Sequence, residues 1–168
     1  CELAYDADNL YFQQSGWTTA GTIADIEQAV NAAGVLYEYQ LGVNYEISAG
    51  IFPDDPATDP YANVHTACSM LGAVTAVWHQ DHAGIVRDLT HMWSGKAFGT
   101  FIGCAYLDTV CNTPQAFAVS KCMGAYLNQA ALVCHELGHV WGACHCCPLY
   151  TPAAADDPSR VDLLRPHT

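Results

Sequence analysis

Apolar side chains recur at the spacing of an α-helix in three stretches of the chain. Before the first stretch, Thr18 or Thr19 stands where a capping hydroxyl is favoured, and Gly42 follows where the helix would end. Gly142 follows the last stretch in the same way. The spacing therefore predicts three helices, over residues 23–40, 64–79 and 126–141.

Stretches with the composition of β-strands lie around and between these helices. Residues 1–14 have the pattern of a strand, or of a strand preceded by a turn. Three prolines and three aspartates mark residues 53–61 as a surface loop. The other predicted strands cover residues 43–52, 100–107 and 115–121, with a further short segment at 85–93. Because strands alternate with helices, we expect a mixed α/β (α+β) fold.

The charge balance is strongly acidic. The chain of 168 residues carries 17 Asp and Glu against 5 Lys and Arg, a formal net charge of −12. Because such a surface repels phosphate groups, we expect no binding to nucleic acid or to anionic membrane surfaces. No apolar run approaches the ~18 residues that a membrane span requires. The expectation is a monomeric globular protein.

Nine cysteines are dispersed along the chain, without the paired CxxC motifs of a zinc knuckle. This usage favours disulfides, and hence a secreted, extracellular protein. Because nine is an odd number, at least one thiol is unpaired or has its partner outside this chain. The sequence starts at Cys1 without a methionine, so we expect a removed leader or a fragment.

The clearest chemical signal lies at the end of the third predicted helix, where residues 135–145 read HELGHVWGACH. Residues four apart share a helix face, so His135 and His139 can bind one metal ion. Glu136 lies beside them and can act as a general base. Gly142 lets the chain turn sharply and bring back His145 as a third ligand. Three histidines with a fourth position open are the ligand set of a catalytic zinc site.

This pattern resembles the HExxHxxGxxH motif of the metzincin zinc metallopeptidases, and the chain is most similar to their reprolysin (adamalysin-like) branch. Residues 88–96 (DLTHMWSGK), 100–111 (TFIGCAYLDTVC) and 118–120 (AVS) resemble further segments of that branch. The resemblance implies a twisted mixed sheet with flanking helices and a cleft above the active-site helix. It also implies that residues 100–107 form an antiparallel edge strand along this cleft.

The function implied by the resemblance is that of a zinc-dependent endopeptidase. His135, His139 and His145 would hold one catalytic Zn²⁺, and Glu136 would be the general base for a metal-activated water. An extended protein or peptide substrate would add itself to the edge strand. The expected substrate-binding residues on that strand are Ile102, Gly103, Cys104 and Ala105.

The chain departs from the metzincin pattern after the third histidine. Metzincins carry a methionine turn there, whereas the last methionine of this chain is Met123. We therefore expect a metallopeptidase domain over residues 1–147, incomplete at its C-terminal end, and an irregular tail over residues 148–168. Two alternatives stay open. One is a zinc-containing, disulfide-stapled binding module that does not cleave, and the other is a structural zinc site with Cys144 or Cys146 as fourth ligand.

Other residues able to bind metals have simpler explanations. We expect His79 and His82 to lie at a solvated helix end, and the acidic loop to be a solvated turn rather than a Ca²⁺ site. The residues expected only to pack are His91, Tyr106 and Trp141. The cysteines around the third histidine (Cys144, Cys146 and Cys147) are expected to form disulfides with Cys104, Cys111, Cys122 or Cys134.

Overall fold

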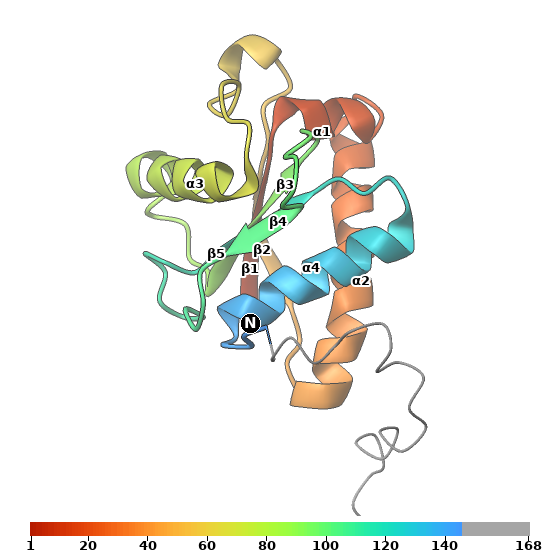
Figure 1. The fold of residues 1–168 in the computed structure, drawn as a ribbon, viewed down its shortest axis with the longest axis vertical. Coiled ribbons are helices and arrows are strands. Elements are labelled where there is room, and N and C mark those ends of the chain that lie inside the picture. The colour runs from red at the N-terminus through yellow and green to blue at the C-terminus, as the bar shows by residue number, and fades with distance from the viewer. Residues whose placement is uncertain (146–168) are drawn as a thin grey trace, which may run out of the picture.

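A five-stranded β-sheet with helices on both faces forms the centre of the protein (Figure 1). The computed structural model describes residues 1–145. Its elements are β1 (Glu2–Ala7), α1 (Asn9–Gln14), α2 (Thr19–Leu41), β2 (Glu46–Ile51), a 3₁₀ turn (Pro56–Thr58), α3 (Ala67–Asp81), β3 (Leu89–Ser94), β4 (Gly103–Ala105), β5 (Phe117–Lys121) and α4 (Tyr126–Val140). This arrangement confirms the expected mixed α/β fold. No helix among the described residues is long and apolar enough to cross a membrane.

The sheet is parallel except at one edge. Its strand order is β2-β1-β3-β5-β4, and only β4 runs antiparallel to its neighbour. The strand expected over residues 100–107 is therefore the antiparallel edge strand, but it is shorter than predicted. Only residues 103–105 form the paired strand, with one further backbone hydrogen bond to β5 on each side, at Ile102 and at Tyr106. The chain turns before this segment at Gly99 (φ +80°) and after it at Asp108 (φ +58°).

The prediction of a strand over residues 1–14 is wrong for its second half. β1 ends at Ala7, and the carboxylate of Asp8 then accepts the backbone N–H of Tyr11 at 2.8 Å. This is the capping arrangement that starts a helix, and α1 follows directly. Tyr11 and Phe12, the aromatic residues that suggested a strand, belong to this short helix, and their side chains are buried in the protein.

Capping side chains also set the beginnings of α2 and α3. Thr18 accepts the N–H of Gly21 and begins α2, which ends at Gly42 in a left-handed conformation (φ +68°). Thr66 accepts the N–H of Ser69, so α3 begins at Ala67, three residues later than the pattern of apolar residues suggested. Capping residues thus account for the starts of α2 and α3 and for the end of α2.

Two apolar cores lie on opposite faces of the sheet. The larger core joins the sheet to α2 and α4, and the second joins it to α3. β1 contributes to both, because Leu3 and Tyr5 face the first core while Ala4 faces the second. Helix α4, which carries the histidine motif, is therefore held between the sheet and α2 (Figure 1).

Candidate metal centre

Helix α4 has one buried face and one face open to a cleft. Val133, Leu137 and Val140 are fully buried against the core. His135 and His139, four residues apart, lie on the other side of the helix, as the sequence predicted. Packing of the apolar face fixes the rotation of α4 and thereby aims both imidazoles in one direction.

The turn after α4 brings His145 back towards the helix. Gly142 adopts φ +93°, which strongly favours glycine, and a Cβ there would lie 3.1 Å from the carboxylate of Asp108. The loop after β4 covers the helix end, since the N–H of Asp108 and of Thr109 donate to the carbonyls of His139 and Val140, both at 2.9 Å. The turn is thus supported from the same loop that leaves the edge strand.

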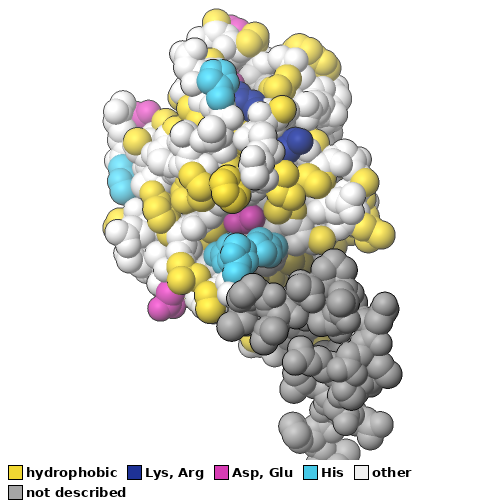
Figure 2. Space-filling model, in the orientation of Figure 1, with side chains coloured by type: hydrophobic (Ala, Val, Ile, Leu, Met, Phe, Trp, Pro, Cys, Tyr) yellow, Lys and Arg dark blue, Asp and Glu magenta, His cyan; other side chains and the backbone are white. Residues whose placement is uncertain are grey.

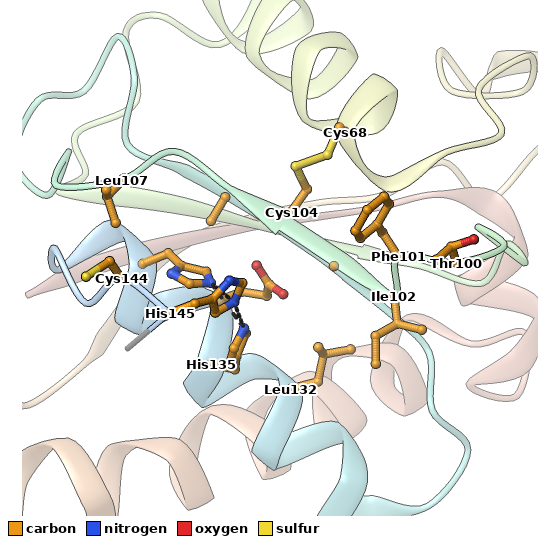
Figure 3. Close-up of a pocket in the computed structure, with 14 residues that line it drawn as sticks. Cys68, Thr100, Phe101, Ile102, Cys104, Leu107, Leu132, His135, Cys144 and His145 are labelled. Carbon is orange, nitrogen blue, oxygen red and sulfur yellow. Dashed lines mark hydrogen bonds between the residues drawn. A yellow bond between two sulfur atoms is a disulfide. The ribbon is translucent and has the colours of Figure 1, made fainter. Parts of the chain in front are cut away.

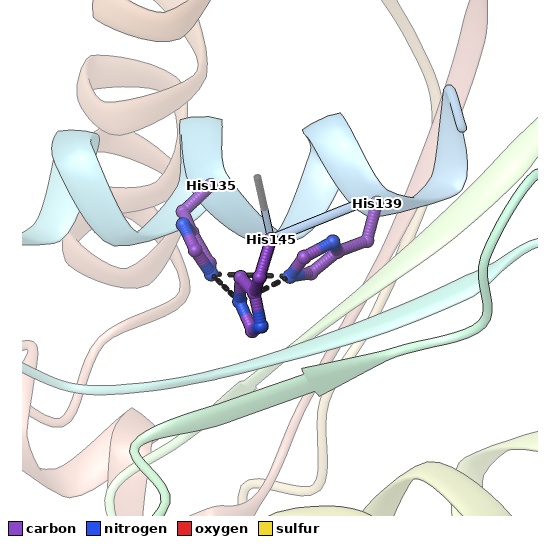
Figure 4. Close-up of side chains that lie close together, drawn as sticks. All are labelled: His135, His139 and His145. Carbon is purple, nitrogen blue, oxygen red and sulfur yellow. Dashed lines mark hydrogen bonds between the residues drawn. The ribbon is translucent and has the colours of Figure 1, made fainter. Parts of the chain in front are cut away.

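The three imidazoles converge on one point (Figure 4). Their Nε2 atoms lie 3.0–3.1 Å from one another. In a tetrahedral zinc site with Zn–N bonds of about 2.0–2.1 Å, nitrogen ligands are separated by roughly 3.3 Å, so the observed triangle fits such an ion. His139 Nδ1 lies 2.6 Å from the carbonyl oxygen of Ala143 and donates to it, which leaves Nε2 as a lone-pair donor.

The surroundings of His135 favour its neutral imidazole. Burial, together with the neighbouring His139 and His145, lowers the pKa of His135 from its ordinary value. A neutral imidazole is the form that binds a metal ion. Within residues 1–145, these three histidines are the one group of His, Cys, Asp or Glu side chains arranged to hold a metal ion.

Glu136 lies in the floor of the cleft between the histidines and the edge strand. It is only 4% exposed, and burial raises the pKa of its carboxyl to about 7. A Cβ built on Gly103 would lie only 2.2 Å from Glu136 Oε1, so the carboxylate packs directly against the strand backbone. The neighbour that comes close to Gly103 is therefore the side chain of Glu136.

The cleft is a cavity of about 640 Å³ with mostly apolar walls (Figure 3). On the molecular surface the histidines form a group beside an acidic side chain and a band of hydrophobic side chains (Figure 2). The cavity is lined by the three histidines, Glu136 and all four residues of the predicted substrate-binding segment. It is also lined by Thr100, Phe101 and Leu107, which belong to the segment expected along the cleft but were not named as substrate-binding, and by Cys68 and Leu132, which the sequence did not suggest. Helical spacing could have identified Leu132, which lies one turn before Glu136 on the same helix.

The edge strand presents free backbone groups to this cleft. Tyr106 N–H donates to Phe117 at 3.1 Å, and the carbonyl of Ile102 accepts from Lys121 at 2.8 Å, so even-numbered residues face β5. By the alternation of an antiparallel pair, the N–H and C=O groups of Gly103 and Ala105 point the other way. These groups are available to an extended chain laid along the strand.

Comparison with known proteins identifies the family. A model of the M12B reprolysin-like metallopeptidases matches residues 23–146, which include every strand except β1 and the whole histidine motif. The chain belongs to this family. Membership in the M12B family implies zinc as the metal, and the histidine cluster fits that ion.

Comparison with solved structures confirms the fold of this M12B chain and gives no information on its function. A chain described as "Structure of a chaperone-substrate complex" superposes with a TM-score of 0.62 over 84% of this chain, at 11% sequence identity. The match covers 23% of that longer chain, so the M12B chain spans about a quarter of its length. No curated protein matches the sequence significantly.

The prediction for Cys104 is wrong. Cys104, one of the expected partners of the cysteines near the third histidine, is bonded instead to Cys68 on α3. Cys144 lines the cleft and has no disulfide partner within residues 1–145. The reason is proximity: α3 packs across β4, whereas Cys144 lies in the turn after α4. Cys146 and Cys147 lie outside the described residues, as does the predicted tail.

Three histidines outside the cluster, His79, His82 and His91, have structural surroundings. His79 Nε2 bonds to the carbonyl of Pro114 at 2.8 Å, and the ring of His82 packs against Trp78 at the end of α3. His91 is fully buried, bonds to Ser120 at 2.9 Å and packs on Trp93, as expected.

The acidic loop is organised by hydrogen bonds to its own backbone. Asp55 accepts the N–H of Ala57, and Asp59 accepts those of Tyr61 and Asn9. The third aspartate, Asp54, is exposed. The carboxylates thus cap turns, and they form no metal-binding group in the described part of the chain.

Proposed function

We propose that this M12B chain is a zinc-dependent endopeptidase whose catalytic domain spans residues 1–147. The observation that carries the proposal is the convergence of three Nε2 atoms beside Glu136 in a cleft bordered by an edge strand. His135, His139 and His145 would hold the ion. Family membership supports the reaction class, and the geometry supports these roles.

Each of the chain's own groups has a distinct part in peptide-bond hydrolysis. Bound zinc supplies Lewis acidity, which polarises a carbonyl and lowers the pKa of a water. Glu136 takes a proton from the attacking water at its carboxylate and passes it to the nitrogen of the leaving amine. Because the carboxylate is almost completely buried, few competing waters surround it during this transfer.

The substrate is proposed to be an extended segment of a protein or peptide. It would pair with β4 through the outward-facing N–H and C=O groups of Gly103 and Ala105, with Ile102 and Cys104 completing this wall of the cleft. Backbone pairing recognises no particular sequence, so side-chain preference would come from the apolar wall. Phe101, Leu107 and Leu132 are apolar side chains of that wall.

The proposed setting is extracellular, with the chain acting as a secreted monomer. The Cys68–Cys104 disulfide is consistent with an oxidising compartment. A disulfide at the rim of the cleft would also stabilise the folded protein, because it restricts the conformations of the unfolded chain. A protein that unfolds less often is cleaved less often by other proteases.

The proposal is tested by cleavage of a reduced, carboxymethylated protein with the purified, zinc-loaded chain. Glu136→Ala should lower kcat by about 10²- to 10⁴-fold while zinc remains bound at one ion per chain. His79→Ala, which removes a histidine outside the cluster, is the matched control and should keep full activity. Absence of cleavage by the zinc-loaded chain, or activity that survives in Glu136→Ala, would refute the proposal.

A further inference from the structure

Glu136 and Gly103 approach each other more closely than any other residue at position 103 would allow. A Cβ built on Gly103 would meet Glu136 Oε1 at 2.2 Å, Cδ at 2.6 Å and Cγ at 2.8 Å. Real Cβ atoms do not approach other heavy atoms this closely. The overlap involves the stem of the side chain as well as its end, so a small adjustment of the carboxylate would not relieve it.

The edge strand cannot retreat from Glu136. β4 is paired with β5 on one side, with Gly103 opposite Ser120. The next residue, Cys104, is bonded covalently to Cys68 on α3. A ladder and a disulfide therefore hold the strand backbone at its present distance from α4.

Helix α4 cannot retreat either. Leu137, the residue after Glu136, is fully buried, as are Val133 and Val140 on the same face. Displacing the helix would open voids in a close-packed core, which costs more than rotating one side chain. With both backbones fixed, the Glu136 side chain is the part that must move when position 103 gains a Cβ.

We propose that Gly103 is a positioning residue: by lacking a side chain, it creates the space in which the Glu136 carboxylate is held beside the three histidines. This inference rests on the proposed function for its catalytic meaning, but the steric relation stands without it. Gly103→Ala would turn Glu136 away from the reacting centre while leaving the histidine ligands in place. Misplacing a catalytic group by about 1 Å can cost 10²-fold in rate.

The first experiment measures thermal unfolding of four metal-free proteins: wild type, Gly103→Ala, Glu136→Ala and the double variant. Gly103→Ala should lower Tm by roughly 5 °C in the wild type and by much less when Glu136 is already alanine. Gly72→Ala is the matched control, because a Cβ at this exposed helical glycine would meet nothing within 4 Å. Equal effects of Gly103→Ala in both backgrounds would overturn the inference.

If Gly103→Ala does not fold alone, the double variant decides. Recovery of a folded chain in Gly103→Ala/Glu136→Ala supports the inference, and failure to recover overturns it. This readout needs neither zinc nor activity, so it is independent of whether the chain cleaves peptides.

The second experiment compares kinetics and zinc affinity. A positioning role predicts that Gly103→Ala lowers kcat by about 10- to 100-fold, with KM and zinc affinity within about threefold of wild type. If the glycine served instead to admit the substrate, KM would rise with kcat unchanged, and the inference would be wrong. If wild-type protein binds zinc but cleaves nothing, the proposed function fails while the Tm comparison still decides on Gly103.

Discussion

The buried residue Asp6, near the end of β1, gives the protein a specific dependence of stability on pH. Its carboxylate is about 1% exposed, and one oxygen, Oδ2, accepts bonds from Tyr61 and Trp78. Burial raises the pKa of Asp6 from 3.8 to about 7, and these two hydrogen bonds offset only part of that shift. The folded protein therefore binds a proton at Asp6 more tightly than the unfolded chain does.

The sign and size of the effect follow from this difference in pKa. Stabilisation by the bound proton is complete below the unfolded pKa near 4 and is lost as the pH rises through about 7. Between pH 5 and pH 8, a group with these two pKa values lowers the free energy of unfolding by roughly 2–3 kcal/mol. Asp6→Asn, which cannot ionise, should remove this part of the pH dependence.

Urea unfolding of the metal-free proteins at several pH values between 5 and 8 measures this contribution. The free energy of unfolding of wild type minus that of Asp6→Asn should fall by roughly 2–3 kcal/mol across this range. The absolute stability of the variant is not diagnostic, because its new N–H₂ group replaces Oδ1, which has no hydrogen-bond partner. Asp54→Asn, at an exposed site, is the control. Parallel pH profiles for wild type and Asp6→Asn would show that Asp6 titrates normally in the folded state.

Three further predictions concern the metal centre and its supports. His145→Ala should weaken zinc binding by about 100-fold or more in a competition with a chromophoric chelator, whereas His79→Ala should bind zinc like wild type. Replacing the disulfide by serines at Cys68 and Cys104 should lower the free energy of unfolding by about 3–4 kcal/mol, as expected for a closed loop with a sequence separation of 36; an unchanged urea midpoint would contradict this. Leu137→Ala should cost about 2–5 kcal/mol in the same assay, because the side chain is fully buried in the core under α4; a loss below about 1 kcal/mol would show that α4 is loosely packed.

The histidine motif was predictable because its information is local. Helical spacing brings His135 and His139 together, and one glycine after the helix allows His145 to return. No distant residue is needed to infer that these side chains lie close to one another. The mixed α/β fold was predictable for a similar reason, since its long helices and most of its strands have clear patterns of apolar residues, and threonines cap the starts of α2 and α3.

One error concerned a local helix cap, and the other two arose where distant contacts decide the structure. Residues 9–14 carry strand-like aromatics, but the carboxylate of Asp8 starts a helix there, and that helix packs on a surface formed by other segments. The length of β4 depends on how much of it lies opposite β5, which the sequence of β4 alone does not contain. Pairing of Cys104 with Cys68 likewise depends on how α3 packs across the sheet.

The turn at residues 141–145 positions two of the histidines, His139 and His145. Ala143 accepts the Nδ1 proton of His139, and the same few residues carry the chain to His145. Loosening this turn would release the orientation of one imidazole and the position of another in a single event. An ion held by these three histidines would therefore depend on the local unfolding equilibrium of five residues beyond the end of α4, as well as on the helix itself.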